Sequence, residues 1–351
     1  MGRYLVQRLL YMLLVLFVVS VITFGLMHLV PGGPFDKEKP LPKEIIANLE
    51  KRYHLDQPLY IQYLEYIRAL LVPRFSEQKF ANNIDSDALF KFKIGKYHVR
   101  WVNFGPSYTS RSRTVNDMLR DQLPISIQLG FLAFCLAILI GMPLGIIAAI
   151  RQNSFLDYFS MALAIFGVSV PVIVLGPILI WVFGVSLKWL PVTGWGSKPP
   201  FTLGIFPNKW GWEYWKFAIM PMFGLGLSSS ASIARLTRAS LLQVIREDYI
   251  RTARAKGLKE RRIIRRHALK NALIPVVTIL GPMFAALLTG TFVTETIFGI
   301  PGMGRYFVNS ITNRDYPVIM GTVLIYAVFL VFSNLIVDLV YGVIDPRIRY
   351  D

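Results

Sequence analysis

The sequence predicts an all-α polytopic membrane protein with six transmembrane helices and one long segment outside the membrane. Hydrophobic residues make up 54% of the 351-residue chain and gather in uncharged runs of about 20 residues or more, long enough to cross a bilayer. The formal net charge of +17 would suit a nucleic-acid partner, but the basic residues cluster in loops between the apolar runs, which is a membrane pattern. The single cysteine, Cys135, excludes an intrachain disulfide.

The first 30 residues predict a short cytoplasmic tail and a first membrane span. Residues 9–30 carry no charge and follow Arg3 and Arg8. A cleaved signal peptide is the alternative, but its apolar region would be shorter and would end in a small-residue cleavage site. The sequence PGGP follows at residues 31–34 instead, so we expect an uncleaved span.

Residues 31–121 form a polar segment that we expect outside the cytoplasm. It carries 15 Lys/Arg and 11 Asp/Glu, and loops longer than about 60 residues escape the positive-inside rule. Residues 41–71 have a mostly helical pattern. Residues 90–102 alternate apolar and polar on both sides of Gly95, which predicts a two-stranded hairpin with an aromatic face and a basic face.

Five further apolar runs complete the prediction of six spans, within a core that covers residues 122–351. The run at 217–234 contains a proline, two glycines and four serines, so we expect it to face other helices rather than lipid. Outside the long segment, 17 Lys/Arg lie on one side of the predicted membrane and 6 on the other, which predicts that both termini are cytoplasmic. The five runs are 125–150, 158–187, 217–234, 271–294 and 316–337.

The loop at residues 235–270 carries twelve Lys/Arg against three acidic residues. Four side chains at helical spacing form an apolar stripe, and Gly257 stands where a helix would stop. This pattern predicts a helix–glycine–helix docking element. A solvated basic loop, or a patch that binds the phosphates of lipid or nucleic acid, is the alternative. The stripe consists of Leu242, Ile245, Tyr249 and Ala253.

Several stretches of this chain resemble one family. YIRTARAKGL at 249–258, HAL at 267–269 and NALIP at 271–275 resemble the cytoplasmic signature loop of ABC importer permeases, in the form found in oligopeptide and dipeptide permease B proteins. The Arg-Thr-Ala sequence at 251–253 replaces the Glu-Ala-Ala of the wider superfamily, as in the peptide branch. Further matches are SVP at 169–171, NFGPSY at 103–108, TETIFGIPGMGR at 294–305 and NRDYP at 313–317. Residues 72–102 do not match and look like an insertion.

The resemblance implies a type I ABC importer permease in a bacterial or archaeal plasma (inner) membrane. It implies a heterodimer with a second permease, two ATP-binding subunits that hold ATP and Mg, and an external peptide-binding protein. Membrane lipid is the other expected contact, nucleic acid is not expected, and the chain itself is expected to hold no cofactor. Nickel-type permeases are the alternative substrate class. The residues that match the loop coupling to the ATP-binding subunit are Tyr249, Arg251, Ala253, Ala255, Gly257, Leu258 and Arg261.

The sequence shows no catalytic motif, so we expect no enzyme activity in this chain. There is no G-x-x-x-x-G-K-[ST], no H-E-x-x-H, and no metal-ligand spacing among the four histidines. A membrane-embedded enzyme is therefore disfavoured, and a secondary transporter would call for buried carboxylates and internal repeats. We expect Glu295 to pair with Arg305 and Asp338 with a cytoplasmic Arg. Candidates for lining a path are Ser169, Pro171, Thr289, Thr291, Thr294 and Glu295.

A lone hairpin is marginally stable, so the hairpin at 90–102 needs a surface to pack on. We expect it to contact the external binding protein or to cap the outer mouth of the path. Packing on the chain's own outer helices is the alternative.

Overall fold

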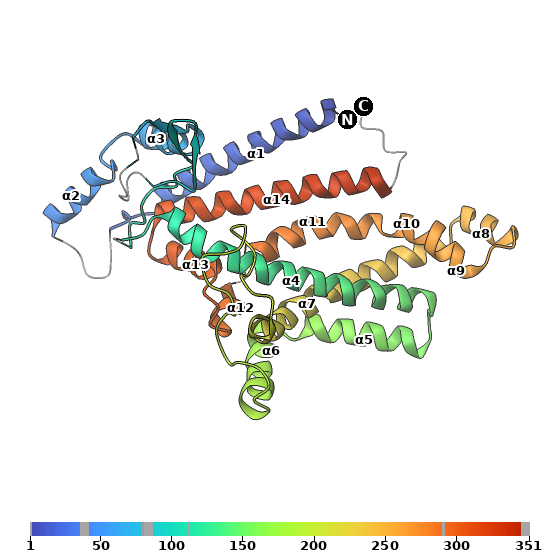
Figure 1. The fold of residues 1–351 in the computed structure, drawn as a ribbon. Coiled ribbons are helices and arrows are strands. Elements are labelled where there is room, and N and C mark those ends of the chain that lie inside the picture. Colours follow the sequence, from blue (N-terminus) through green and yellow to red (C-terminus); the bar gives the residue numbers. More distant parts are fainter. Residues whose placement is uncertain are drawn as a thin grey trace. The chain divides into compact units, whose positions relative to one another are not determined.

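The computed structural model describes residues 2–35, 42–78, 80, 87–110, 112–289 and 292–344, and the chain divides into two compact units (Figure 1). Unit 1 comprises Met1–Met12, Ile125–Pro301 and Val328–Asp351, and unit 2 comprises Leu13–Pro124 and Gly302–Ala327.

Helices dominate the described chain. The first helices are α1 (Gly2–Leu29), α2 (Lys43–Arg52) and α3 (Leu59–Leu71), followed by strands β1 (Arg74–Ser76), β2 (Phe90–Ile94) and β3 (Tyr97–Trp101). Then come α4 (Val115–Ile150), α5 (Phe155–Ser169), α6 (Val172–Leu179), the π-helix η2 (Ile180–Ser186) and α7 (Trp212–Ile245). The last elements are α8 (Asp248–Ala255), α9 (Glu260–Arg262), the π-helix η3 (Ile263–Ala268), α10 (Leu269–Ala272), α11 (Ile274–Leu288), α12 (Phe292–Ile297), α13 (Met303–Thr312) and α14 (Tyr316–Ile344).

Five stretches of the described chain are long and apolar enough to cross a membrane, and a bent pair of helices makes a sixth if it counts as one span. The bent pair corrects the expectation of a single run at 158–187, because Phe155–Ser169 and Val172–Ser186 meet at 98°. The break falls at Pro171, and Val170 before it is extended (φ −98°, ψ 107°), as a residue that precedes proline prefers. The five stretches are Val6–Leu29, Val115–Ile150, Trp212–Ile245, Glu260–Ile297 and Tyr316–Tyr341.

Helix α7 lies at the centre of unit 1, and small residues let its neighbours approach its backbone. A Cβ at Gly141 or Gly145 of α4 would come within 2.5 Å of a carbonyl oxygen of α7, and a Cβ at Gly167 of α5 within 2.8 Å. In α7's most apolar window 56% of the residues are buried, against 28% in that of α4. The expectation that the 217–234 run faces other helices is therefore confirmed.

Unit 2 is held by a buried core and by one carboxylate. Asp315 accepts hydrogen bonds from the Ser107 hydroxyl and from the backbone N–H groups of Tyr108 and Thr109, at 2.5 to 3.2 Å. This carboxylate ties the 103–108 loop to the turn before α14. The two stretches therefore meet although about 200 residues separate them. The core around them includes Met27, Phe104, Val115, Leu119 and Tyr316.

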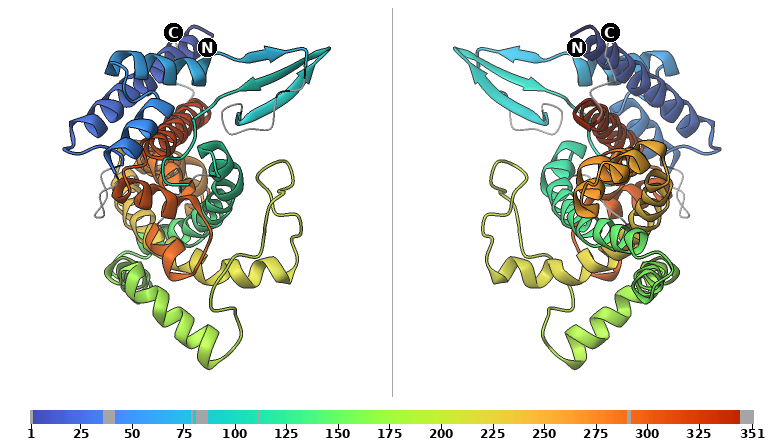
Figure 2. Two further views of the ribbon diagram at one scale, coloured as in Figure 1. Left: turned by 90° about the vertical axis from the view of Figure 1, so that its left-hand side faces the viewer. Right: turned by 90° about the vertical axis from the view of Figure 1, so that its right-hand side faces the viewer.

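The strands of unit 2 form a three-stranded antiparallel sheet in the order β1-β3-β2 (Figure 2). The sequence predicts only the pair around Gly95, so the short strand β1 is an addition to the expected two-stranded hairpin. Three residues are too few for an alternation of apolar and polar side chains to stand out. Trp101 donates its indole N–H to the carbonyl of Leu71, which ties β3 to the end of α3 (3.1 Å).

Candidate functional site

The segment between α7 and α11 folds as a helix, a glycine turn and a second helical stretch. Helix α8 is eight residues long and has Asp248 in its first turn, where an acidic side chain suits the helix dipole. Gly257 follows with φ +72°, and its N–H donates to the carbonyl of Arg254 (2.9 Å). A Cβ at Gly257 would meet no atom within 4 Å, so the backbone conformation, rather than space, favours glycine here.

Helix α8 turns its apolar side toward this chain's own core. Ile250 and Ala253 are buried, at 0% and 7% exposure, in a cluster that also contains Leu241, Ile263 and Ala268. The expected stripe through Tyr249 is wrong at that residue, which is 40% exposed. The helical register breaks after Ile245, where α7 ends, and α8 starts anew at Asp248.

Ala253 therefore packs inside this chain, in the same cluster as Ile250. The other matched residues of the loop lie at the surface or close to it. Arg251, Ala255, Gly257 and Arg261 are exposed, as is Tyr249, and Leu258 is half-buried. The exposed side of α8 carries two arginines, Arg251 and Arg254, against one acidic residue, Asp248, which lies 3.4 Å from Arg251.

Two polar ties hold this loop in one shape. The Asn271 side-chain amide donates a hydrogen bond to the Tyr249 hydroxyl (2.8 Å). That hydroxyl in turn donates to the backbone carbonyl of His267 (3.4 Å). Three residues from the three matched motifs therefore meet. Arg254 donates two hydrogen bonds to Glu260, at 2.7 and 3.2 Å, and so bridges the turn at Gly257.

A second ion pair, which the sequence reasoning missed, links α7 to the start of α5. Arg238 donates from Nε and from a terminal nitrogen to the two oxygens of Asp157, both at 2.7 Å, and Asp157 is 1% exposed. The Ser154 hydroxyl caps α5, and the backbone N–H of Asn153 also donates to Asp157. Asp157 stands one residue before an uncharged run in the sequence. A charge at the edge of a predicted span is the only sequence feature that could have indicated this ion pair.

The path candidates lie on two spans and differ in exposure. Ser169 and Pro171 are exposed at the α5–α6 break, and Thr289 is half-buried with its hydroxyl bonded to its own helix. Thr294 and Glu295 on α12 are fully buried, and Glu295 accepts a hydrogen bond from Ser126 (2.7 Å). Thr291 lies outside the described residues.

Asp338 pairs with an arginine, as the sequence analysis predicts. The partner is Arg8 near the start of α1, at 2.6 Å.

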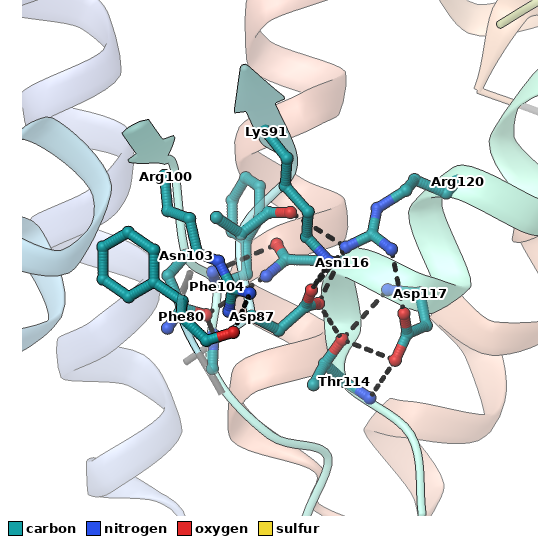
Figure 3. Close-up of polar contacts among 12 residues, drawn as sticks. Phe80, Asp87, Lys91, Arg100, Asn103, Phe104, Thr114, Asn116, Asp117 and Arg120 are labelled. Atoms are coloured by element: carbon teal, nitrogen blue, oxygen red, sulfur yellow. Dashed lines mark hydrogen bonds and ion pairs between the residues drawn. The ribbon is translucent and has the colours of Figure 1, made fainter. Parts of the chain in front are cut away.

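A polar cluster in unit 2 fastens the strands to the start of α4 (Figure 3). Asp87, 8% exposed, accepts from Thr114 (2.6 Å) and from Arg120 (2.7 and 2.8 Å), and Lys91 of β2 lies at 2.5 Å. Burial raises the pKa of Asp87, but the hydrogen bonds from Lys91, Thr114 and Arg120 lower it more, so the net pKa falls well below the ordinary 3.8. Asp87 is therefore ionised at neutral pH.

Comparison with known proteins finds matches along nearly the whole chain. The family model "Binding-protein-dependent transport system inner membrane component" matches residues 141–350, and the model for the N-terminal part of such membrane components matches residues 1–130. The chain is similar to the dipeptide transport system permease protein DppB of Bacillus subtilis, at 42% identity over 99% of this chain and 98% of that protein. It is 40% identical to the oligopeptide transport system permease protein OppB of Salmonella typhimurium over 100% of both chains. An inward-facing structure of the MetNI methionine ABC transporter matches with a TM-score of 0.48 and 19% identity, covering 64% of this chain and 94% of that one.

Proposed function

The chain belongs to the family of binding-protein-dependent transport system inner membrane components, and from that premise we propose that it is the permease subunit of an ATP-driven peptide importer. Its full-length relatives are named as dipeptide and oligopeptide permeases, which supports peptides over nickel as the cargo. The chain is a multi-pass protein of the inner membrane with the type I importer permease fold.

The proposed complex contains this chain, a second and related permease, two ATP-binding subunits and an external peptide-binding protein. The transport path runs between the two permeases, and the chain itself carries out no chemical reaction. ATP and Mg bind to the partner subunits. Both termini and the 235–270 loop are cytoplasmic in this proposal, and residues 31–121 are external, in accord with the 17 to 6 distribution of basic residues.

The exposed basic side of α8 is the proposed contact with an ATP-binding subunit. Its buried side fastens the helix to this chain through Ile250 and Ala253, and the ties at Tyr249 and Arg254 hold the turn. Rigidity matters because moving a two-state path from 1:99 to 99:1 requires a differential affinity of about 5.5 kcal/mol, which this contact has to transmit. A loose loop would absorb that difference.

The observation that carries the proposal is the two-sided α8, with one side in the core and one side free for a partner. Two exposed arginines of the same loop test it: Arg251 on the proposed contact and Arg265 on η3. In the purified complex reconstituted in liposomes, we expect Arg251→Glu to retain ATP hydrolysis and lose about tenfold in peptide uptake, equivalent to about 1.4 kcal/mol of coupling. Arg265→Glu should take up peptide normally. Normal uptake by the Arg251 variant would refute the contact.

A further inference from the structure

The sheet of unit 2 has one face that is apolar throughout. Directly paired residues of an antiparallel sheet point to the same side. The register pairs Phe90 with Trp101, Ile94 with Tyr97, and Val99 with both Phe75 and Phe92. All seven apolar side chains of the three strands therefore share one face, which we call the aromatic face: Phe75, Phe90, Phe92, Ile94, Tyr97, Val99 and Trp101.

The aromatic face is uncovered in the described part of the chain. Val99 at its centre is 2% exposed, and the six surrounding side chains are 39 to 61% exposed. A contiguous apolar surface of this kind marks a contact with a membrane or a protein. The described residues supply no cover from the chain's own helices, which was the alternative weighed from the sequence.

The opposite face carries the charges of the sheet, and all of them are basic. It holds Arg74, Ser76, Lys91, Lys93, His98 and Arg100. Lys91 pairs with Asp87, and Lys96 at the turn pairs with Glu77 (2.7 Å). The three strands contain no acidic residue. Trp and Tyr with flanking Lys and Arg are typical of the interface between acyl chains and anionic headgroups.

Unit 2 also places the sheet beside a membrane span. The Tyr63 hydroxyl of α3 bonds to Ser20 of α1 (2.7 Å), and its ring packs against Phe24. Ser20 lies nine residues before the end of the span Val6–Leu29, which is about 13 Å along a helix. Helix α3 therefore packs against the C-terminal part of the α1 span, and the Trp101–Leu71 hydrogen bond joins the sheet to the end of α3.

The strands lie across the direction of α1. Figure 1 shows the direction of the residue 13–29 part of α1, and Figure 2 shows the strands projecting sideways from it. A sheet that lies across a membrane-spanning helix runs along the membrane surface. We propose that the aromatic face of this sheet docks on the bilayer beside α1, at the boundary between headgroups and acyl chains.

A protein partner fits this face less well. Protein interfaces of separable partners are only a little over half apolar and carry about one hydrogen bond per 100–200 Å². The aromatic face offers only one hydroxyl and one indole N–H, and that N–H already bonds to Leu71. Lipid acyl chains require no hydrogen bonds.

The test uses environment-sensitive fluorophores on single cysteines of the full chain in its complex, with Cys135 replaced by Ala. The complex is placed in nanodiscs of phosphatidylethanolamine and phosphatidylglycerol. Phe92→Cys and Ile94→Cys report on the aromatic face, and Lys93→Cys between them reports on the basic face. We expect phospholipids with a nitroxide on the upper acyl chain to quench the labels at 92 and 94 severalfold more than the label at 93. Aqueous iodide should show the reverse order.

Two results would overturn the proposal. Equal access of iodide to positions 92 and 93 would mean that the aromatic face is open to water. Protection of position 92 from both iodide and nitroxide lipids would mean that protein covers it, either the second permease or the binding protein. Lipid quenching at 92 and 94 should persist when the binding protein and its peptide are added. Using two positions on the face guards against a local disturbance from either substitution.

Discussion

The Asp157–Arg238 pair joins α5 to α7, the helix that leads into α8. The carboxylate is buried and receives both guanidinium donors, while the Arg238 side chain keeps 28% exposure. Breaking such a pair on one side leaves a charge without its counterion, and this costs more than the intact pair contributes. The pair therefore makes α7 intolerant of changes at either residue.

Asp157→Asn is predicted to destabilise the purified complex by about 3 kcal/mol, the lower end for a buried pair because Arg238 is partly exposed. The matched control is Glu213→Gln, which breaks the Lys216–Glu213 pair, whose carboxylate side chain is 81% exposed. That control should cost at most about 1 kcal/mol. The midpoint of thermal inactivation compares the two, and the exchange of Asp157→Arg with Arg238→Asp should recover part of the loss. Equal midpoints for the first two variants would contradict the role given to the pair.

Asp87 makes the attachment of the sheet dependent on pH. Its pKa in the folded chain lies below the ordinary 3.8, so its stabilisation is fully present above that value and is lost as the pH falls through it toward the folded pKa. Limited proteolysis between pH 7 and pH 3 should cleave the 72–102 region faster at the acid end. Asp87→Asn should be cleaved faster than the native chain at pH 7 and should lose most of this pH dependence. An unchanged pH profile in the variant would assign the effect to other groups.

At the scale of elements, close approach between α4 and α7 organises unit 1. Gly141 and Gly145 of α4 face α7 carbonyls, and a side chain at either position would collide with the α7 backbone. In a membrane such contacts replace the hydrophobic effect as the source of helix association, because lipid is as apolar as the helices.

Gly145→Ala is predicted to destabilise the protein by about 1–3 kcal/mol, because the added methyl group would lie 2.5 Å from the carbonyl oxygen of Ala234 and force the helices apart. Gly25→Ala in α1 is the control, since a Cβ there meets no atom within 4 Å. That control should be neutral or stabilising by about 0.5–1 kcal/mol, as alanine favours helix over glycine. The midpoint of thermal inactivation of the two variants tests this prediction. An unchanged midpoint for the Gly145 variant would show that the helices have room to move.

The elements also show where sequence reasoning succeeds and where it stops. Long uncharged runs and Gly257 were readable because hydropathy and backbone preference are local properties. The 98° bend at Pro171 was missed because proline is compatible with both a kink and a break. The expected stripe fails at Tyr249, where Ile250 is buried instead, because two residues between α7 and α8 shift the helical register and periodicity alone does not reveal such a shift.

At the scale of the whole molecule, the fold class and the family follow from the sequence because many short motifs occur in order along one chain. Contacts between distant residues do not follow, as with Asp315 and the 107–109 loop, or Tyr249 and Asn271. Each needs the tertiary arrangement before the side chains can be paired. The path candidates illustrate the same limit, since two spans contribute them and whether their side chains meet depends on the packing.

In the proposed function, this chain converts ATP hydrolysis by partner subunits into peptide movement. The most direct measurement is uptake of a labelled peptide into proteoliposomes that contain the complex purified through a tag on this chain, with binding protein on one side and ATP on the other. We expect ATP-binding subunits to co-purify and peptide to accumulate only when ATP and binding protein are both present. A chain that purifies without an ATP-binding subunit, or peptide accumulation that a proton or sodium gradient drives without ATP, would contradict it.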